Sequence, residues 1–118
     1  MRFRRTGVAS ASSAVACFLL LAVTPLASSP AVLKHGDALY RSHCAGCHGS
    51  KGRGDGPEVD RKDRRNRPAN LTMSRSPEDV VFNKIWNGRK DPDMPAFKSR
   101  MTKDEVQAVV AFVLSLRP

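Results

Sequence analysis

The sequence lacks the motifs that most enzyme classes require. Its 118 residues include three cysteines, too few for a framework of several disulfides. The segment 49–67 is rich in glycine and basic residues, yet the order G-x-x-x-x-G-K-[ST] of a phosphate-binding loop is absent. No nucleophile motif is present, and the carboxylates are scattered without a visible pair for acid–base catalysis. Without these motifs, the sequence contains no recognisable active site built from side chains alone.

Two of the three cysteines form the most informative motif. Cys44 and Cys47 lie in the string C-x-x-C-H, which ends at His48 and is typical of covalent c-type haem attachment. Each thiol can bond one vinyl-derived carbon of the same porphyrin, and the next residue carries its imidazole under the ring. The predicted cofactor is one haem c attached through both cysteines, with the imidazole as an iron ligand.

Three other interpretations of this cysteine pair fit less well. A thioredoxin-like dithiol should lie in a βαβ pattern, which the sequence lacks. A zinc site needs four ligands, and the remaining candidates of the usual types are Cys17, His35 and His43. A plain disulfide within the motif leaves its histidine without a role.

The N-terminal residues 1–31 have the order of a secretory signal peptide. Three arginines precede the uncharged apolar run 14–23, and a stretch of small residues follows it. Cleavage after Ala31 satisfies the rule of small residues, and cleavage near Ala27 is the alternative. Cys17 lies inside the apolar run and is interpreted as a small hydrophobic residue rather than a lipid-attachment site.

The alternative to cleavage is a retained membrane anchor. Residues 8–27 are long enough to be compared with a spanning helix, but they contain serines, a threonine and a proline. We therefore expect a removed signal, a domain at residues 32–118 and a periplasmic location. Both cysteines that remain would then be used by the haem.

The chain is basic, with 20 lysines and arginines against 11 acidic residues. Removal of the three N-terminal arginines leaves 17 basic residues and a net charge of +6. We expect this charge to draw the domain to redox proteins with acidic docking surfaces, and not to nucleic acid. The basic run 61–67 lacks interleaved aromatic residues, and is interpreted first as a solvated loop and second as a docking patch.

The domain is predicted to be all-α, with three helices, long loops and no sheet. The first helix spans residues 34–48 and carries Gly36 one turn before Tyr40. The second begins with Ser76 as its N-cap, followed by a proline, and ends at Gly88.

A connecting loop at residues 89–100 leads to the last helix. Thr102 and Glu105 predict a capping box at its start, and valines recur at helical spacing up to Leu116. The buried haem is expected to supply much of the apolar surface that so small a domain needs.

The second side of the haem iron needs a ligand or stays open. The candidates are Met73, Met94, Met101, His35 and His43. Met94 stands out because it lies in a loop and precedes a proline, which favours extended backbone. His43 is tethered too near the motif, Met101 adjoins the capping box, and Met73 is the alternative. Ligation by His48 and Met94 would raise the reduction potential and leave no site for a substrate.

Together these segments resemble the class I c-type cytochromes, especially the small single-haem bacterial kind. The resemblance covers residues 34–116, and is carried by Gly36-x-x-x-Tyr40, Cys44 to Gly49, Gly54 to Pro57, Pro68 to Leu71, Gly88 and Met94-Pro95-x-Phe97. It implies a small cytochrome c fold around one haem, with His48 as the proximal and Met94 as the distal ligand.

The resemblance carries two further implications. The helix that bears Gly36 and Tyr40 is expected to cross the C-terminal helix near Phe112. A proline carbonyl is expected to accept a hydrogen bond from the proximal imidazole, with Pro68 favoured and Pro57 as the alternative.

The sequence therefore predicts a periplasmic electron carrier, not an enzyme, that serves respiratory or dehydrogenase partners. We expect a monomer or a subunit, with membrane contact only if the N-terminal segment is retained. Two alternatives stay open: a haem-bearing subunit of a larger oxidoreductase, and a haem protein with an open distal site.

Overall fold

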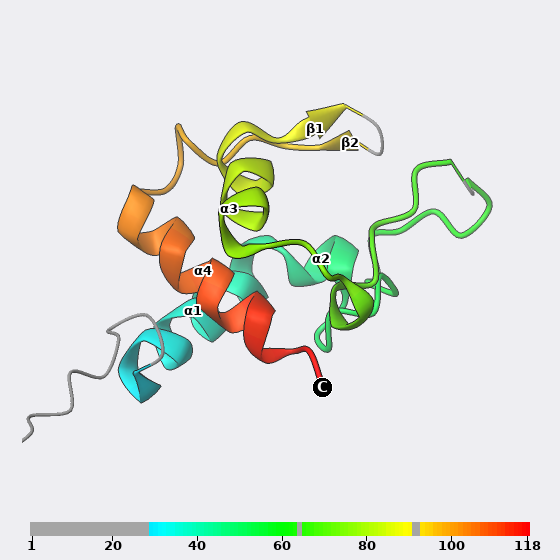
Figure 1. Cartoon of the computed structure of the whole chain (residues 1–118). Coiled ribbons are helices and arrows are strands. Elements are labelled where there is room, and N and C mark those ends of the chain that lie inside the picture. Colours follow the sequence, from blue (N-terminus) through cyan, green and yellow to red (C-terminus); the bar gives the residue numbers. More distant parts are fainter. Residues whose placement is uncertain (1–28, 64, 91–92) are drawn as a thin grey trace, which may run out of the picture.

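Four helices, one 3₁₀ turn and a minimal hairpin make up the described structure (Figure 1). This computed structural model describes residues 29–63, 65–90 and 93–118. In chain order the elements are α1 (Pro30–His43), α2 (Ala45–His48), η2 (Leu71–Met73), α3 (Glu78–Asn87), β1 (Arg89–Lys90), β2 (Asp93–Met94) and α4 (Lys103–Ser115). The all-α prediction is confirmed.

Most of the predicted signal segment, including Cys17, lies outside the described residues. Its last three residues lie inside them: Ser29 caps α1 by accepting a hydrogen bond from the Val32 backbone N–H, and Pro30 opens the helix. Cleavage after Ala31 would remove this cap, whereas cleavage near Ala27 would keep it. In the described ranges no helix has the length and hydropathy that a membrane crossing requires.

The first and last helices cross at a glycine. A side chain at Gly36 would overlap the Ala108 carbonyl of α4 and meet Phe112 Cβ at 3.0 Å. One turn later, the Tyr40 ring packs against the Phe112 ring with centroids 5.1 Å apart. The crossing implied by the resemblance is therefore present, because only glycine lets the two backbones approach so closely.

The core lies where α1, α3 and α4 meet (Figure 1). The predicted valine stripe of α4 is its centre, and Val106, Val109 and Val110 are fully buried together with Tyr40. The predicted capping box is also confirmed: Thr102 Oγ1 accepts from the Glu105 N–H, and the Glu105 carboxylate accepts from the Thr102 N–H at 2.7 Å.

The predicted single helix at residues 34–48 is wrong in both extent and continuity. The helix begins earlier, at Pro30, and breaks at Cys44, whose φ of −121° lies outside the helical range. The chain then turns into the short helix α2, tied back by the bond from the His48 N–H to the Cys44 carbonyl at 2.8 Å. This break gives the short helix that carries Cys47 and His48 its own direction.

The second predicted helix begins later than expected. Pro77, not Ser76, occupies the N-cap position, no side chain caps the helix, and α3 starts at Glu78. The Ser76 hydroxyl instead accepts a hydrogen bond from Lys84 Nζ at 3.2 Å. Its predicted end is confirmed, since Gly88 has a φ of +72° and its N–H bonds to the Lys84 carbonyl.

The prediction of no sheet is wrong in one detail. After Gly88 the chain forms the hairpin β1–β2, with Arg89 opposite Met94 and Lys90 opposite Asp93. The positive φ of Gly88 turns the chain, and the residue before Pro95 is held in extended backbone, which can pair.

Candidate functional site

One cavity of about 520 Å³ brings together the four predicted site residues. Cys44, Cys47 and His48 line it from the α1–α2 side, and Met94 lines it from β2. Helix α3 and the C-terminal half of α4 contribute further wall residues. The cavity therefore unites two segments that lie far apart in the sequence.

The cavity fits a haem in size and in chemistry. Its volume falls within the range of roughly 300–1,000 Å³ that is typical of cofactor sites. Several of its wall residues are buried and apolar or aromatic, as a flat macrocycle requires: Tyr40, Val81, Ile85, Phe97, Val109 and Val113. The donor set consists of two thiols, an imidazole and a thioether, which are the groups used for haem attachment and iron ligation.

His48 is held by backbone contacts on several sides. Its N–H donates to the Cys44 carbonyl, and its own carbonyl accepts from the Gly54 N–H at 2.8 Å. The ring Nδ1 lies 3.3 Å from the Ala69 carbonyl oxygen, where it can donate a hydrogen bond as Nδ1–H and leave Nε2 free. Burial lowers the pKa of His48, against a smaller raising effect of the Ala69 bond. Both observations describe a neutral imidazole suited to metal ligation.

The carbonyl that orients His48 differs from the expectation. It belongs to Ala69, not to Pro68 or Pro57. The Pro68 carbonyl instead faces Gly54, where a Cβ would lie 2.5 Å from its oxygen. Gly54 has a φ of +76°, and its missing side chain lets the 68–69 segment approach the motif.

The two thiols are not poised for dithiol chemistry. Burial raises the pKa of the Cys44 thiol to about 11, with a further contribution from Cys47. Burial also raises the pKa of Cys47, helped by the Glu58 carboxylate, whose Oε2 lies 3.9 Å from the sulfur. Reactive cysteines show the opposite shift, so the raised pKa values argue against a thioredoxin-like role.

The structure also bears on the zinc and disulfide alternatives. Cys44 and Cys47 are both free. In the described part of the chain, no three His, Cys, Asp or Glu side chains gather as metal ligands. A tetrahedral zinc site needs such a set.

Among the described methionines, Met94 is the one that lines the cavity. It is half-buried, whereas Met73 on η2 is 74 % exposed and Met101 is buried in the core. The histidine His43 does line the cavity, and its ring lies edge-on to Phe97 with centroids 6.2 Å apart. By its position in the structure, Met94 is therefore a better candidate ligand than Met73 or Met101.

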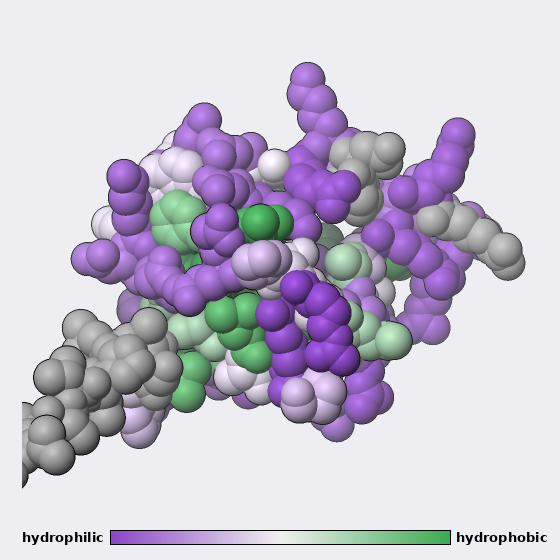
Figure 2. All heavy atoms as spheres, in the orientation of Figure 1, coloured by the Kyte–Doolittle hydropathy of each residue, from purple (hydrophilic) through white to green (hydrophobic). Residues whose placement is uncertain are grey.

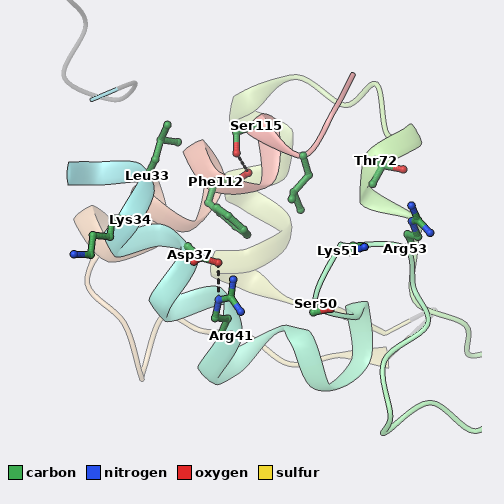
Figure 3. Close-up of a pocket in the computed structure, with 11 residues that line it drawn as sticks. Leu33, Lys34, Asp37, Arg41, Ser50, Lys51, Arg53, Thr72, Phe112 and Ser115 are labelled. Carbon is green, nitrogen blue, oxygen red and sulfur yellow. Dashed lines mark hydrogen bonds and ion pairs between the residues drawn. The ribbon is translucent and has the colours of Figure 1, made fainter. Parts of the chain in front are cut away.

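A second, shallower hollow of about 760 Å³ lies between α1, the loop after α2 and the end of α4 (Figure 3). Basic side chains surround it, and Arg41 donates to the Asp37 carboxylate at 2.9 Å. Its described lining contains no cysteine, histidine or methionine. It therefore lacks the donors that a covalently attached haem needs, and the smaller cavity is the candidate cofactor site.

The sequence analysis missed several residues at this site. Ala69 orients the imidazole through its backbone, and no side-chain pattern could have pointed to it. Asn66 and Asp63 line the cavity from the basic run 61–67, for which the sequence predicts first a solvated loop and second a docking patch. Nothing in that run distinguishes inward-facing from outward-facing residues.

Comparison with known proteins gives consistent matches. A family model described as "Cytochrome C oxidase, cbb3-type, subunit III" matches residues 31–113. A protein named Cytochrome c6 from Thermosynechococcus vestitus is 32% identical over 101 residues, covering 86% of this chain and 84% of that protein. A Cytochrome c6 from Thermostichus vulcanus is 31% identical, with the same coverage of each chain.

Two solved structures share the fold. One belongs to the Kuenenia stuttgartiensis reducing HAO-like protein complex, with a TM-score of 0.68 and 24% identity over 81% of this chain. This chain spans 48% of that chain's length. The other is the c-type cytochrome KustC0563, with a TM-score of 0.56 and 24% identity, covering 70% of this chain and 98% of that one.

Proposed function

This chain belongs to the class I c-type cytochromes, and we propose that it carries single electrons between redox proteins of the periplasm. The family is one of haem-bearing electron carriers. We assign one haem c to the cavity, attached through Cys44 and Cys47, with His48 and Met94 as the axial ligands. When bound, the haem supplies a one-electron iron couple.

The observation that carries this proposal is the shared cavity. Both thiols, the imidazole and the thioether line a single space of about 520 Å³ with apolar walls. The Ala69 carbonyl holds the imidazole in one orientation and increases its basicity as a ligand. A thioether on the opposite side raises the reduction potential and leaves no coordination position for a substrate.

We also propose that the basic run 61–67 is the docking surface for acidic partners. Asp60, Asp63 and Asn66 line the cavity, while the described cations of the run, Arg61, Lys62, Arg65 and Arg67, are exposed and absent from its wall. The run projects as an arm from the helices (Figure 1), and hydrophilic side chains gather on that side in Figure 2. Its residues Asp63 and Asn66 place it beside the cavity. Its positive charge therefore lies next to the haem site.

The first test is expression with a haem-attachment system, followed by intact mass and a reduced-minus-oxidised spectrum of the periplasmic fraction. We expect a mass increase of one haem per chain and a low-spin spectrum. Cys44→Ala and Cys47→Ala should each remove one of the two covalent links. A periplasmic protein without covalently held haem would overturn the proposal.

Met94→Ala tests the distal ligand. We expect loss of the far-red band of thioether-ligated ferric haem, a lower potential and binding of added imidazole. Met73→Ala is the matched control, because that side chain is exposed, and it should leave all three readouts unchanged. An unaltered spectrum in Met94→Ala would support the open distal site instead.

The docking proposal is tested by two charge-reversal sets of equal size. Arg61→Glu, Lys62→Glu and Arg65→Glu change the arm, whereas Lys34→Glu, Lys51→Glu and Arg53→Glu change the hollow of Figure 3. With hexacyanoferrate(III) as a small anionic oxidant, the first set should slow oxidation more than the second at low salt. The difference should vanish at high salt. Equal slowing by both sets would contradict the assigned surface.

A second candidate is a haem-bearing electron-transfer subunit of a larger oxidoreductase. The family model is described as an oxidase subunit, and one structural neighbour comes from a multi-protein complex. Size-exclusion chromatography of the protein from its native membranes and periplasm separates the two cases. A stable complex that co-purifies with a catalytic chain supports the subunit, and a free monomer supports the carrier.

A further inference from the structure

The side chain of Asn66 connects the basic run to the hairpin that bears Met94. The Asp93 backbone N–H donates a hydrogen bond to Asn66 Oδ1 at 2.8 Å. These residues are 27 positions apart in the chain, and Asp93 immediately precedes Met94. Both Asn66 and Asp93 line the same cavity as Met94. The contact therefore acts on the backbone one residue away from the proposed distal ligand.

The hairpin that bears Met94 is short. Each strand has two residues, and Met94 pairs with Arg89 at the end next to Gly88. Ribbons of two strands are marginally stable in water by themselves. Pro95 has no N–H to donate, and the next backbone tie to α3 comes at Phe97, whose N–H bonds to the Ile85 carbonyl at 3.1 Å. The hydrogen bond to Asn66 restrains the chain one residue before Met94.

The loop around Asn66 is ordered by its own hydrogen bonds. The Asp60 carboxylate accepts from the Lys62 N–H at 2.9 Å, and the Asp63 carboxylate accepts from the Arg65 N–H at 3.0 Å. These local turns give the arm a defined path, and Asn66 follows the second of them. A braced acceptor can restrain the hairpin, whereas a freely moving one could not.

We propose that Asn66 is a positioning residue for Met94, and that the run 61–67 braces the hairpin against the cofactor cavity. The inference rests on the proposed role of Met94 as distal ligand. Its physical basis is that the Asp93 N–H, which is exposed to solvent, has a fixed partner in Asn66 and gains freedom to move when that acceptor is removed. A restrained hairpin keeps the thioether in place while the protein meets its partners.

The test compares Asn66→Ala, Asn66→Asp and Lys62→Ala in the haem-loaded protein. Alanine removes the acceptor, aspartate retains an acceptor oxygen, and Lys62→Ala changes the same loop at an exposed cation. The first readout is hydrogen exchange at the Asp93 amide, measured by NMR. We expect fast exchange in Asn66→Ala, and protection in Asn66→Asp and Lys62→Ala.

The second readout is displacement of the thioether by added imidazole, followed through the far-red band. Asn66→Ala should bind imidazole roughly tenfold more tightly, as expected for one lost net hydrogen bond. The two other variants should stay near the parent protein. Guanidinium unfolding reports whether the variant loses global stability, since a local brace should leave the main transition almost unmoved.

The results for Met94→Ala and Asn66→Ala distinguish failure of the proposed brace from failure of the proposed ligand. If Met94→Ala leaves the spectrum unchanged, the ligand assignment itself is wrong. If Met94→Ala loses the band but Asn66→Ala keeps both Asp93 amide protection and the parent imidazole affinity, the ligand stands and the brace is overturned. Equal imidazole tightening in Lys62→Ala would likewise overturn it, because that change leaves the hydrogen bond in place.

Discussion

The two sides of the cofactor cavity are built in different ways. On the cysteine side, Cys44 joins α1 to the short helix α2 that carries Cys47 and His48. The carbonyls of Cys44 and Ala69 and the N–H of Gly54 form hydrogen bonds with the histidine. On the methionine side, Met94 lies on a two-residue strand, with a tie from Asn66 ahead of it. The cysteine side is held mainly by hydrogen bonds between residues close in sequence, with one from the more distant Ala69. The methionine side has a hairpin of two-residue strands and a hydrogen bond to Asn66, 27 positions away. Substitutions on the two sides should therefore alter different measurements. Those on the cysteine side should shift the NMR signal of the His48 ring, and those on the methionine side should ease displacement of the thioether.

The largest expected effect is on the helix crossing behind the cysteine side. Gly36→Val would force a side chain into the Ala108 carbonyl, and we expect it to lower the free energy of unfolding by about 3 kcal/mol or more. Ala38→Val is the control, because Ala38 lies on the exposed face of the same helix. Guanidinium unfolding followed by circular dichroism measures both. Equal destabilisation by the two variants would contradict the crossing.

A smaller effect is expected at the turn that positions the imidazole. Gly54→Ala introduces a side chain at a φ of +76° and within 2.5 Å of the Pro68 carbonyl oxygen. We expect a loss of about 2 kcal/mol of stability and a shifted NMR signal of the His48 ring. The far-red thioether band should be unaffected, since Met94 lies on the other side.

The corresponding change on the methionine side is Gly88→Ala. Its φ is +72°, and a Cβ there would lie 2.6 Å from the Met94 carbonyl oxygen. We expect a loss of about 1–2 kcal/mol and easier displacement of the thioether by imidazole, with the His48 ring signal unchanged. If Gly54→Ala and Gly88→Ala altered the same readouts, the two sides would not be independent.

The smallest effect is expected far from both sides, at the capping box of α4. Thr102→Ala should lower stability by about 1 kcal/mol at neutral pH and leave both ligand readouts unchanged. Hydrogen bonds from the Thr102 backbone and hydroxyl lower the pKa of Glu105. The carboxylate therefore contributes stability above its unfolded pKa, and loses it as the pH falls through its lower folded pKa. The difference between parent and variant should shrink in that acidic range.

Several elements could be predicted because their signals are local. The capping box at Thr102 and the stop at Gly88 each follow from a few neighbouring residues and one backbone rule, whereas the helix crossing at Gly36 was expected from the family resemblance. The break at Cys44 was missed because helical spacing continues on both sides of it. The hairpin at Met94 was missed because pairing over two residues leaves no periodic pattern.

The sequence by itself determined the chemistry of this protein. The spacing of Cys44, Cys47 and His48 predicts haem attachment through covalent geometry that needs no further contacts, and the family follows from it together with the other segments. Only the tertiary structure decided which carbonyl orients the imidazole, which methionine lines the cavity, and which loop braces it. Those choices depend on backbone groups and side chains that are distant in sequence, and their contacts exist only once the chain has folded.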